Sequence, residues 1–181
     1  MAGGAARDRE VVLETDRLLL RPWRVDEAAI QREMWIERDP RVPPHRRIDA
    51  DGHPTVADFE KAIRADKPSS AGLLAVERKA EGDAIGYCGL VDSGHGAQEP
   101  ELAFEFLRRF WGQGYAFEAV SATLGHGARA FGLRRVLAVV SPANQGSIRV
   151  LEKAGMRFER MHAMDPKEAE VRLYARDLSG A

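Results

Sequence analysis

Hydrophobic positions follow two different spacings along the chain, and the spacing changes several times. Alternating or continuous apolar runs predict strands over residues 11–21, 73–78, 84–91, 99–107, 135–140, 158–161 and 170–177. Helical spacing predicts helices over residues 26–37, 112–131 and 144–154, with a further short helix that begins at Thr55. The resulting order, β-α-α-β-β-β-α-β-α-β-β, indicates an α/β fold with one mixed sheet and helices on both faces.

Residues with special backbone or capping properties mark the ends of these elements. Pro22 closes the first strand because proline has no amide hydrogen for a strand ladder. Asp26 is a typical N-cap residue, and Gly132 lies where a C-cap glycine belongs. The order of elements over residues 101–140 is strand, helix, strand. Because such units are almost always right-handed, we expect this one to form a right-handed parallel crossover. Residues 39–54 are rich in proline and charge, and loops of that length are often functional.

Length and charge narrow the class of protein. With 181 residues, 44% of them apolar, the chain is long enough for one well-buried domain, in which we expect residues 1–10 to be a flexible extension. A net charge of −1 argues against a general nucleic-acid or membrane-surface role. The lone Cys88 excludes an internal disulfide, and the charged N-terminus is unlike a signal peptide. We therefore expect a soluble, cytoplasmic, single-domain protein.

The most informative segment is Arg109-Phe-Trp-Gly-Gln-Gly114, which follows a predicted strand and precedes a predicted helix. Two glycines at such a junction allow backbone amides to approach an anion, which the positive end of the helix dipole also favours. The pattern alone is weak. It is not a phosphate-binding loop of the Gly-Lys-Ser/Thr type, and it lacks the third glycine of the dinucleotide fingerprint. Context, not the motif itself, therefore indicates an anion site.

A second segment gives the anion site an identity by resemblance. Ser141-Pro-Ala-Asn-Gln-Gly-Ser147 leads into a predicted helix that ends at Ala154-Gly-Met-Arg-Phe158, and Tyr115-Ala-Phe-Glu-Ala119 opens the preceding helix. Together with the opening Leu13–Pro22 and Ile85–Leu90 segments, these motifs resemble the GNAT superfamily of acyl-CoA N-acyltransferases. The branch most resembled includes the acetyltransferases of ribosomal-protein N-termini. The resemblance implies a GNAT fold, whose mostly antiparallel sheet contains one splayed parallel pair of strands.

The resemblance also implies a donor site for acetyl-CoA. Backbone amides of the turn and the following helix start would hold the pyrophosphate, and the strand end and the last helix would hold the pantetheine arm. The residues implied are Phe106, Leu107, Arg109, Gly112, Gln113, Gly114, Tyr115, Ala116, Asn144 and Ser147. Ser147 corresponds to a family serine that binds the arm or protonates the departing thiolate. Transfer in this family is direct, in a ternary complex, and needs neither a metal ion nor a covalent enzyme intermediate.

The chemistry also needs a base, because amines are mostly protonated at neutral pH. A lysine amine is only about 0.04% neutral at pH 7, whereas an α-amine is roughly a tenth neutral, so an N-terminal acceptor needs less help. Glu101 and Glu105 alternate onto one face of the strand that leads to the turn. We predict that these two carboxylates relay the proton through water, and that Ser147 completes the catalytic set.

Several alternatives stay open at this level. The two glutamates can instead form a solvated or ion-paired strand face, Ser147 can start the last helix, and Arg109 can pair with a surface carboxylate. The acceptor is expected to be a protein or peptide N-terminus, with a small-molecule amine as the alternative. A non-catalytic acyl-CoA sensor, an unrelated nucleotide-phosphate binder and a homodimeric assembly also remain open. Met156 stands where the family usually has an aromatic residue, which should affect packing more than donor binding.

Overall fold

The computed structural model describes residues 11–40, 42–66, 72–94, 99–163 and 170–179. The predicted N-terminal extension, residues 1–10, lies outside this range. The strands are β1 (Leu13–Glu14), β2 (Leu18–Arg21), β3 (Gly72–Arg78), β4 (Ala84–Val91), β5 (Glu101–Phe106), β6 (Arg135–Val140), β7 (Arg157–His162) and β8 (Val171–Asp177). The helices are α1 (Ala28–Glu37), α2 (Val56–Ala65), α3 (Tyr115–Phe131) and α4 (Gln145–Lys153), with short 3-10 turns η1 (Val25–Glu27), η2 (Pro44–Arg46) and η3 (Arg108–Phe110).

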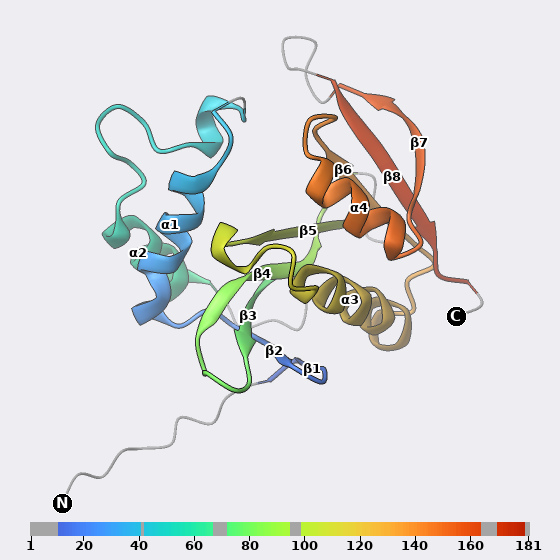
Figure 1. Ribbon diagram of the computed structural model, residues 1–181, viewed down its shortest axis with the longest axis horizontal. Coiled ribbons are helices and arrows are strands. Elements are labelled where there is room, and N and C mark those ends of the chain that lie inside the picture. Colours follow the sequence, from blue (N-terminus) through green and yellow to red (C-terminus); the bar gives the residue numbers. More distant parts are fainter. Residues whose placement is uncertain (1–10, 41, 67–71, 95–98, 164–169, 180–181) are drawn as a thin grey trace, which may run out of the picture.

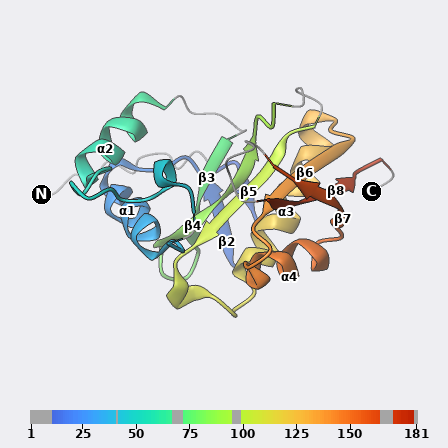
Figure 2. The ribbon, with the colours of Figure 1, turned by 90° about the horizontal axis from the view of Figure 1, so that it is seen from above.

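The eight strands form one mixed sheet in the order β1-β2-β3-β4-β5-β6-β8-β7. All neighbouring strands are antiparallel except β5 and β6, which the α3 crossover makes parallel. Helices α1 and α2 lie on one side of the sheet, whereas α3 and α4 lie on the other (Figures 1 and 2). The predicted mixed sheet with helices on both faces is confirmed.

Several predicted boundaries were wrong. Asp26 is not the N-cap of the first helix, because it lies inside the 3-10 turn η1, and α1 begins at Ala28 after Glu27. The first strand is not continuous over residues 11–21, because Thr15 turns the chain and makes a hairpin of β1 and β2. In this turn the Thr15 amide donates to the Leu18 carbonyl at 3.0 Å, and the Leu18 amide donates to Thr15 Oγ1 at 3.0 Å. The helix predicted from residue 112 begins only at Tyr115, because Gly112 and Gly114 have φ values of 75° and 84°. Such left-handed backbone is incompatible with a right-handed helix.

The main hydrophobic core lies between the sheet and the α3–α4 layer. Alternate residues of the strands face this layer, so that Leu18, Leu20, Val76 and Cys88 are fully buried against it. Val120 and Leu124 of α3 and Leu151 of α4 complete the core from the helix side. This packing fixes the starts of α3 and α4 relative to the ends of β5 and β6. Within the described residues, no helix has both the length and the apolar character to cross a membrane.

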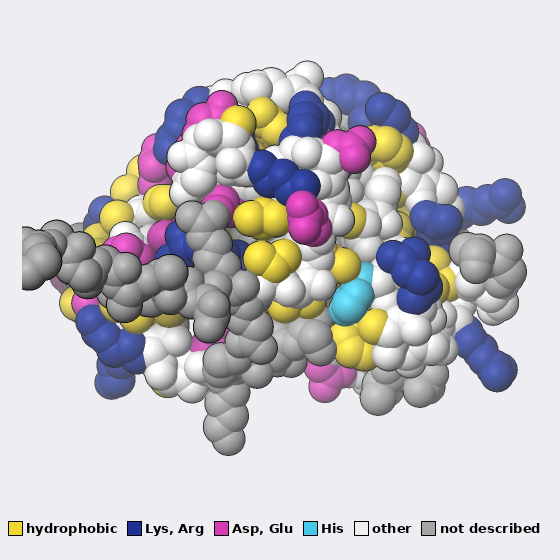
Figure 3. All heavy atoms as spheres, turned by 90° about the horizontal axis from the view of Figure 1, so that it is seen from below, with side chains coloured by type: hydrophobic (Ala, Val, Ile, Leu, Met, Phe, Trp, Pro, Cys, Tyr) yellow, Lys and Arg dark blue, Asp and Glu magenta, His cyan; other side chains and the backbone are white. Residues whose placement is uncertain are grey.

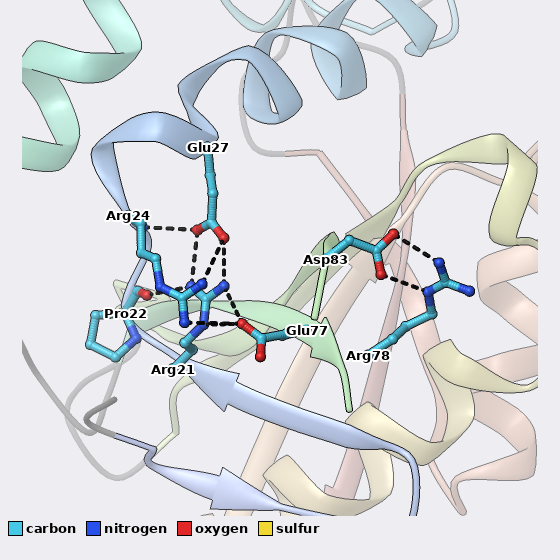
Figure 4. Close-up of polar contacts among 7 residues, drawn as sticks. All are labelled: Arg21, Pro22, Arg24, Glu27, Glu77, Arg78 and Asp83. Carbon is cyan, nitrogen blue, oxygen red and sulfur yellow. Dashed lines mark hydrogen bonds and ion pairs between the residues drawn. The ribbon is translucent and has the colours of Figure 1, made fainter. Parts of the chain in front are cut away.

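A buried cluster of charges joins the start of α1 to the other face of the sheet (Figure 4). The Arg21 side chain, 2% exposed, bonds Glu27 through both terminal nitrogens, and its Nε donates to Glu77 at 2.8 Å. Arg24 approaches the same Glu77 carboxylate at 3.1 Å. Burial acts to lower the pKa of Arg21, but the bonds and charges of Glu27 and Glu77 raise it overall, so the guanidinium stays charged. The cluster anchors the start of α1. The residue after its other end, Arg38, bonds Glu105 of β5.

Candidate active site

The parallel strands β5 and β6 separate toward their C-terminal ends. Their pairing places Glu101 opposite Leu137, and the Leu137 amide donates to the Pro100 carbonyl at 2.9 Å. The Leu107 amide donates to Ile85 of β4 at 3.1 Å. Because successive peptide groups of a strand point to opposite edges, the backbone groups of Phe104 and Phe106 point toward the β6 side. The separating strands therefore present backbone amides to a ligand in the gap between them.

The glycine turn, residues 109–114, lies between β5 and α3. Gly114 is the residue that precedes the helix, and no side chain caps the helix start there. The first intrahelical bond joins the Glu118 amide to the Gly114 carbonyl at 3.1 Å. The amides of Tyr115, Ala116 and the next residue are thus the orphan donors of the first turn. Their position at the positive end of a 17-residue helix suits a phosphate group.

Arg17 and Glu118 link this turn to the β1–β2 hairpin through hydrogen bonds. Glu118 accepts bonds from Thr15 Oγ1 at 2.6 Å, from the Arg17 amide at 2.9 Å and from Arg17 Nε at 2.7 Å. Arg17 in turn donates to the Gln113 carbonyl at 3.1 Å, and its guanidinium lies 4.5 Å from the centre of the Tyr115 ring. Glu118 therefore connects the β1–β2 hairpin to the turn.

The arginines beside the turn bond to α1. Arg109 forms an ion pair with Glu33, and its carbonyl accepts from the Gln113 side chain at 3.1 Å. The Arg108 amide donates to the Glu37 carboxylate at 2.8 Å. The Arg109 guanidinium, for which we expected an anion-binding role, is thus engaged with a carboxylate in this structure. Only the backbone of Arg109 takes part in the turn, through the bond that its carbonyl accepts from Gln113.

Trp111 closes the end of β5. The residue is 62% exposed, and its indole nitrogen donates to the Phe106 carbonyl at 2.7 Å. Phe106 and Leu107 are themselves buried, so they offer only backbone groups at this edge. An exposed aromatic ring beside the end of β5 is suited to pack against an extended ligand that lies in the gap between β5 and β6.

The second helix start, that of α4, follows β6 after four residues. Asn144 is its N-cap, and the Asn144 side-chain oxygen accepts from the Ser147 amide at 3.0 Å. Ser147 lies in the first turn and is partly exposed. The capping role that we had considered for Ser147 belongs to Asn144. The Ser147 hydroxyl therefore lies in the first turn of α4.

The two strand glutamates lie on the α1 face of β5, opposite the core. Glu105 Oε2 accepts from Arg38 Nη2 at 2.5 Å, from Arg38 Nε at 3.0 Å and from the Tyr87 hydroxyl at 2.9 Å. Glu105 Oε1 accepts from Arg38 Nε at 2.9 Å. Glu101 lies four residues earlier, at the point where β5 meets β6. The structure thus places Glu105 in a built polar cluster near the open strand end and Glu101 at the closed end.

Sequence patterns did not single out Arg38, Tyr87 or Arg17. Tyr87 alternates onto the Glu105 face, and the β4–β5 register puts the two residues opposite each other, so pairing of the strands would have located it. Arg38 comes from the end of α1, 67 residues away from Glu105, and only the tertiary fold brings it there.

The environments of Cys88 and His126 argue against a catalytic role for either side chain. Burial raises the pKa of Cys88 to about 12, so the thiol is protonated at neutral pH. Burial together with the charge of Arg129 lowers the pKa of His126, whose ring packs edge-on against Phe131. Among the described residues, no group of three or more histidine, cysteine or carboxylate side chains is arranged to hold a metal ion.

Surface hollows occur away from the open, C-terminal ends of the separating strands. One of about 350 Å³ is lined by His45, Arg47, Asp49, His53, Pro54 and Asp58, and another of about 550 Å³ by Glu99, Gly132, Arg134 and Arg135. On the face shown in Figure 3, acidic and basic side chains are interspersed among hydrophobic ones. We give the hollows no part in donor binding, because the helix starts and the strand gap lie elsewhere.

Comparisons with known proteins agree with this geometry. Residues 17–157 match the family model for the acetyltransferase (GNAT) domain. YkkB of Bacillus subtilis is 37% identical over 98 residues, which are 54% of this chain and 57% of YkkB. The N-acetyltransferase p20 of Bacillus licheniformis is 28% identical over 165 residues, which are 89% of this chain and 90% of p20.

Solved structures share the fold. A GNAT-family acetyltransferase from Bacillus anthracis superimposes with a TM-score of 0.75 at 24% identity, covering 91% of this chain and 97% of its own. Mycobacterium smegmatis RimJ, solved with a CoA disulfide, gives 0.69 at 22% identity, covering 90% and 82%. Spermidine N-acetyltransferase SpeG of Vibrio cholerae gives 0.70 at 14% identity, covering 91% and 96%. The match to the family model, together with the separating parallel strands and the two helix starts beside them, shows that this chain belongs to the GNAT family of acetyltransferases.

Proposed function

We propose that this GNAT protein transfers an acetyl group from acetyl-CoA to the α-amine of a protein or peptide N-terminus, by direct attack in a ternary complex. The amides at the start of α3 bind the pyrophosphate, and the gap between β5 and β6 receives the pantetheine arm. Backbone donors aimed at the thioester oxygen stabilise the negative charge that develops there during attack. Ser147, at the start of α4, is the proposed proton donor to the departing thiolate.

The single observation that favours a monoamine acceptor is the pairing of the carboxylates along α1 and β5. Glu33 and Glu105 form ion pairs with Arg109 and Arg38, whereas the Glu37 carboxylate accepts a hydrogen bond from the Arg108 backbone amide. A polyamine carries several positive charges and would need several carboxylates free to bind them. An N-terminal amine carries one charge and is partly neutral at pH 7, so it places a smaller demand on the site.

Glu105 is the proposed proton acceptor, with Glu101 contributing from the same strand face. The carboxylate is fixed by four contacts, of which three involve Oε2. Because a carboxylate oxygen can accept two bonds, Oε1 retains the capacity to accept one from the amine or from an intervening water. General-base help of this kind contributes roughly 10²–10⁴-fold to a rate.

Release of free coenzyme A tests the proposal when it is measured with a panel of acceptors. The panel contains peptides with free N-termini and the same peptides with a blocked N-terminus and a single lysine. It also contains two small-molecule amines, spermidine and an aminoglycoside. We expect turnover with free N-termini and at least about tenfold lower kcat/KM with the blocked lysine peptides, since the lysine amine is far less neutral. Preferred turnover of spermidine would replace the N-terminal acceptor by a small-molecule one. Acetyl-CoA binding without turnover of any amine would indicate a sensor domain.

A further inference from the structure

The end of α1 delivers one side chain to the Glu105 carboxylate. Arg38 is the residue that follows α1, and its side chain is only 8% exposed. Its guanidinium lies 4.3 Å from the centre of the Trp35 ring, and Trp35 packs edge-on against Phe59 of α2. Burial acts to lower the pKa of Arg38, but hydrogen bonds and charge from Glu105 raise it overall, so this cation stays charged. Arg38 is thus held by both helices while it bonds the strand.

The same guanidinium also grips the segment between α1 and α2. Arg38 Nη1 donates to the Arg46 carbonyl at 3.0 Å, while Nε and Nη2 are directed at Glu105. The planar fork of an arginine can make these bonds at once, which a lysine ammonium cannot do with the same geometry. One side chain therefore links the η2 turn to the strand that carries the proposed proton acceptor.

We infer that Arg38 is a positioning residue, which fixes the Glu105 carboxylate through both oxygens so that Oε1, the oxygen with fewer contacts, serves the acceptor amine, and which ties the η2 turn to β5. This inference rests on the proposed function for its catalytic part. Tyr87 assists from β4 by donating to Oε2, without contact to the η2 turn among the hydrogen bonds of the described residues. Arg38 acts through Glu105 and does not itself take part in proton transfer.

A double-mutant cycle tests the catalytic part. We expect Arg38→Met to lower kcat about 10–100-fold, as loss of an oriented base should, with the KM for acetyl-CoA changed less than twofold. In a Glu105→Gln background the same substitution should lower kcat by no more than about twofold, because coupled residues are not additive. Losses that multiply in the double variant would show a role independent of Glu105 and overturn the inference.

Two further variants keep the test decisive if Arg38→Met folds poorly. Arg38→Lys retains the charge but loses the fork, so we expect a kcat between those of the wild type and Arg38→Met. Tyr87→Phe removes one donor to Oε2, and its smaller loss of kcat should also vanish in the Glu105→Gln background. Arg64→Met is the matched control, since Arg64 pairs with Glu60 on the exposed surface of α2. Wild-type kcat in both Arg38→Lys and Tyr87→Phe would contradict the assignment.

Hydrogen exchange measures the link to the η2 turn without any turnover. Amides of residues 42–53 should exchange faster in Arg38→Met or Arg38→Lys than in the wild type, but not in Tyr87→Phe or Arg64→Met. Unchanged exchange in both Arg38 variants would disprove the link. If no amine is acetylated by the wild type, the proposed function and the catalytic part fail together, whereas the exchange result still decides the link.

Discussion

Arg17 Nε lies 2.7 Å from Glu118 Oε2, and this bond joins the β1–β2 hairpin to the first turn of α3. The same arginine donates to the Gln113 carbonyl, so the hairpin supports the turn from which the α3 amides project. A glutamate in the first turn of a helix also interacts favourably with the helix dipole. The proposed donor site therefore depends on a residue pair that is 101 positions apart in sequence.

Glu118→Gln should weaken this support. The neutral amide cannot form the charged bonds to Arg17 and Thr15, so we expect the KM for acetyl-CoA to rise about 3–10-fold with little change in kcat, by loss of interactions worth about 1–2 kcal/mol. Steady-state kinetics with varied acetyl-CoA provide the measurement. A fall in kcat at unchanged KM would instead place Glu118 in the chemical step.

The pH dependence of stability gives a second test of Glu118. Burial alone would raise its pKa, but hydrogen bonds from Thr15 and Arg17 outweigh burial and lower the pKa in the folded protein. The folded state then binds fewer protons than the unfolded state, so the stabilisation is present above the ordinary carboxyl pKa of about 4.3 and is lost as pH falls through the lowered value. The difference in unfolding free energy between the wild type and Glu118→Gln should therefore shrink below about pH 4. A difference that grows on acidification would be inconsistent with a lowered pKa.

Gly114→Ala should impair the donor site through the backbone. Gly114 has φ of 84°, and an added Cβ would lie 3.3 Å from Arg17 Nη2. An alanine there costs roughly 1–2 kcal/mol and is expected to displace the α3 amides, which raises the KM for acetyl-CoA. Gly132→Ala is the control, because Gly132 has φ of 61° at the opposite end of α3 and open space around it. Equal KM values for the two variants would argue against a specific role of the turn.

Arg21→Met should be strongly destabilising. The substitution leaves Glu27 and Glu77 buried without their main cation, and breaking a buried ion pair in this way costs about 3–5 kcal/mol. Chemical denaturation would measure the loss, with Arg64→Met expected to stay within about 0.5 kcal/mol of the wild type. A loss below about 1 kcal/mol for Arg21→Met would mean that water or neighbouring groups replace the guanidinium.

Cys88→Ala should leave catalysis unchanged. The thiol is fully buried, lies 3.3 Å from the Thr123 hydroxyl and has its pKa raised to about 12, so it is not a nucleophile at neutral pH. We expect unaltered kcat, modestly reduced stability, and alkylation of the wild-type thiol only after unfolding. Rapid alkylation of the native protein with loss of activity would overturn this assignment.

The apolar pattern was sufficient for most of the elements, because the buried positions form one face of a helix, as in α4, or a continuous run in a central strand, as in β4. It failed where side chains or backbone conformation overrode periodicity. Thr15 makes a turn inside an apolar run, and Gly112 and Gly114 delay the start of α3. At the candidate site, Asn144 and Ser147 were proposed from their motif, whereas only the structure shows the capping bond between them. Glu105 was proposed from strand alternation, whereas its partners Arg38 and Tyr87 were not.

The sequence by itself determined the order of the elements, the face of β5 on which Glu101 and Glu105 lie, and the glycine turn before α3, since all of these depend on neighbours within a few residues. Only the tertiary structure decided which groups meet. Arg38 reaches Glu105, Arg17 supports the turn, and β6 separates from β5, because these contacts follow from how α1 and the sheet pack. Ion pairs between distant segments leave no periodic trace in a sequence, so their partners emerge only when the core has fixed the elements in space.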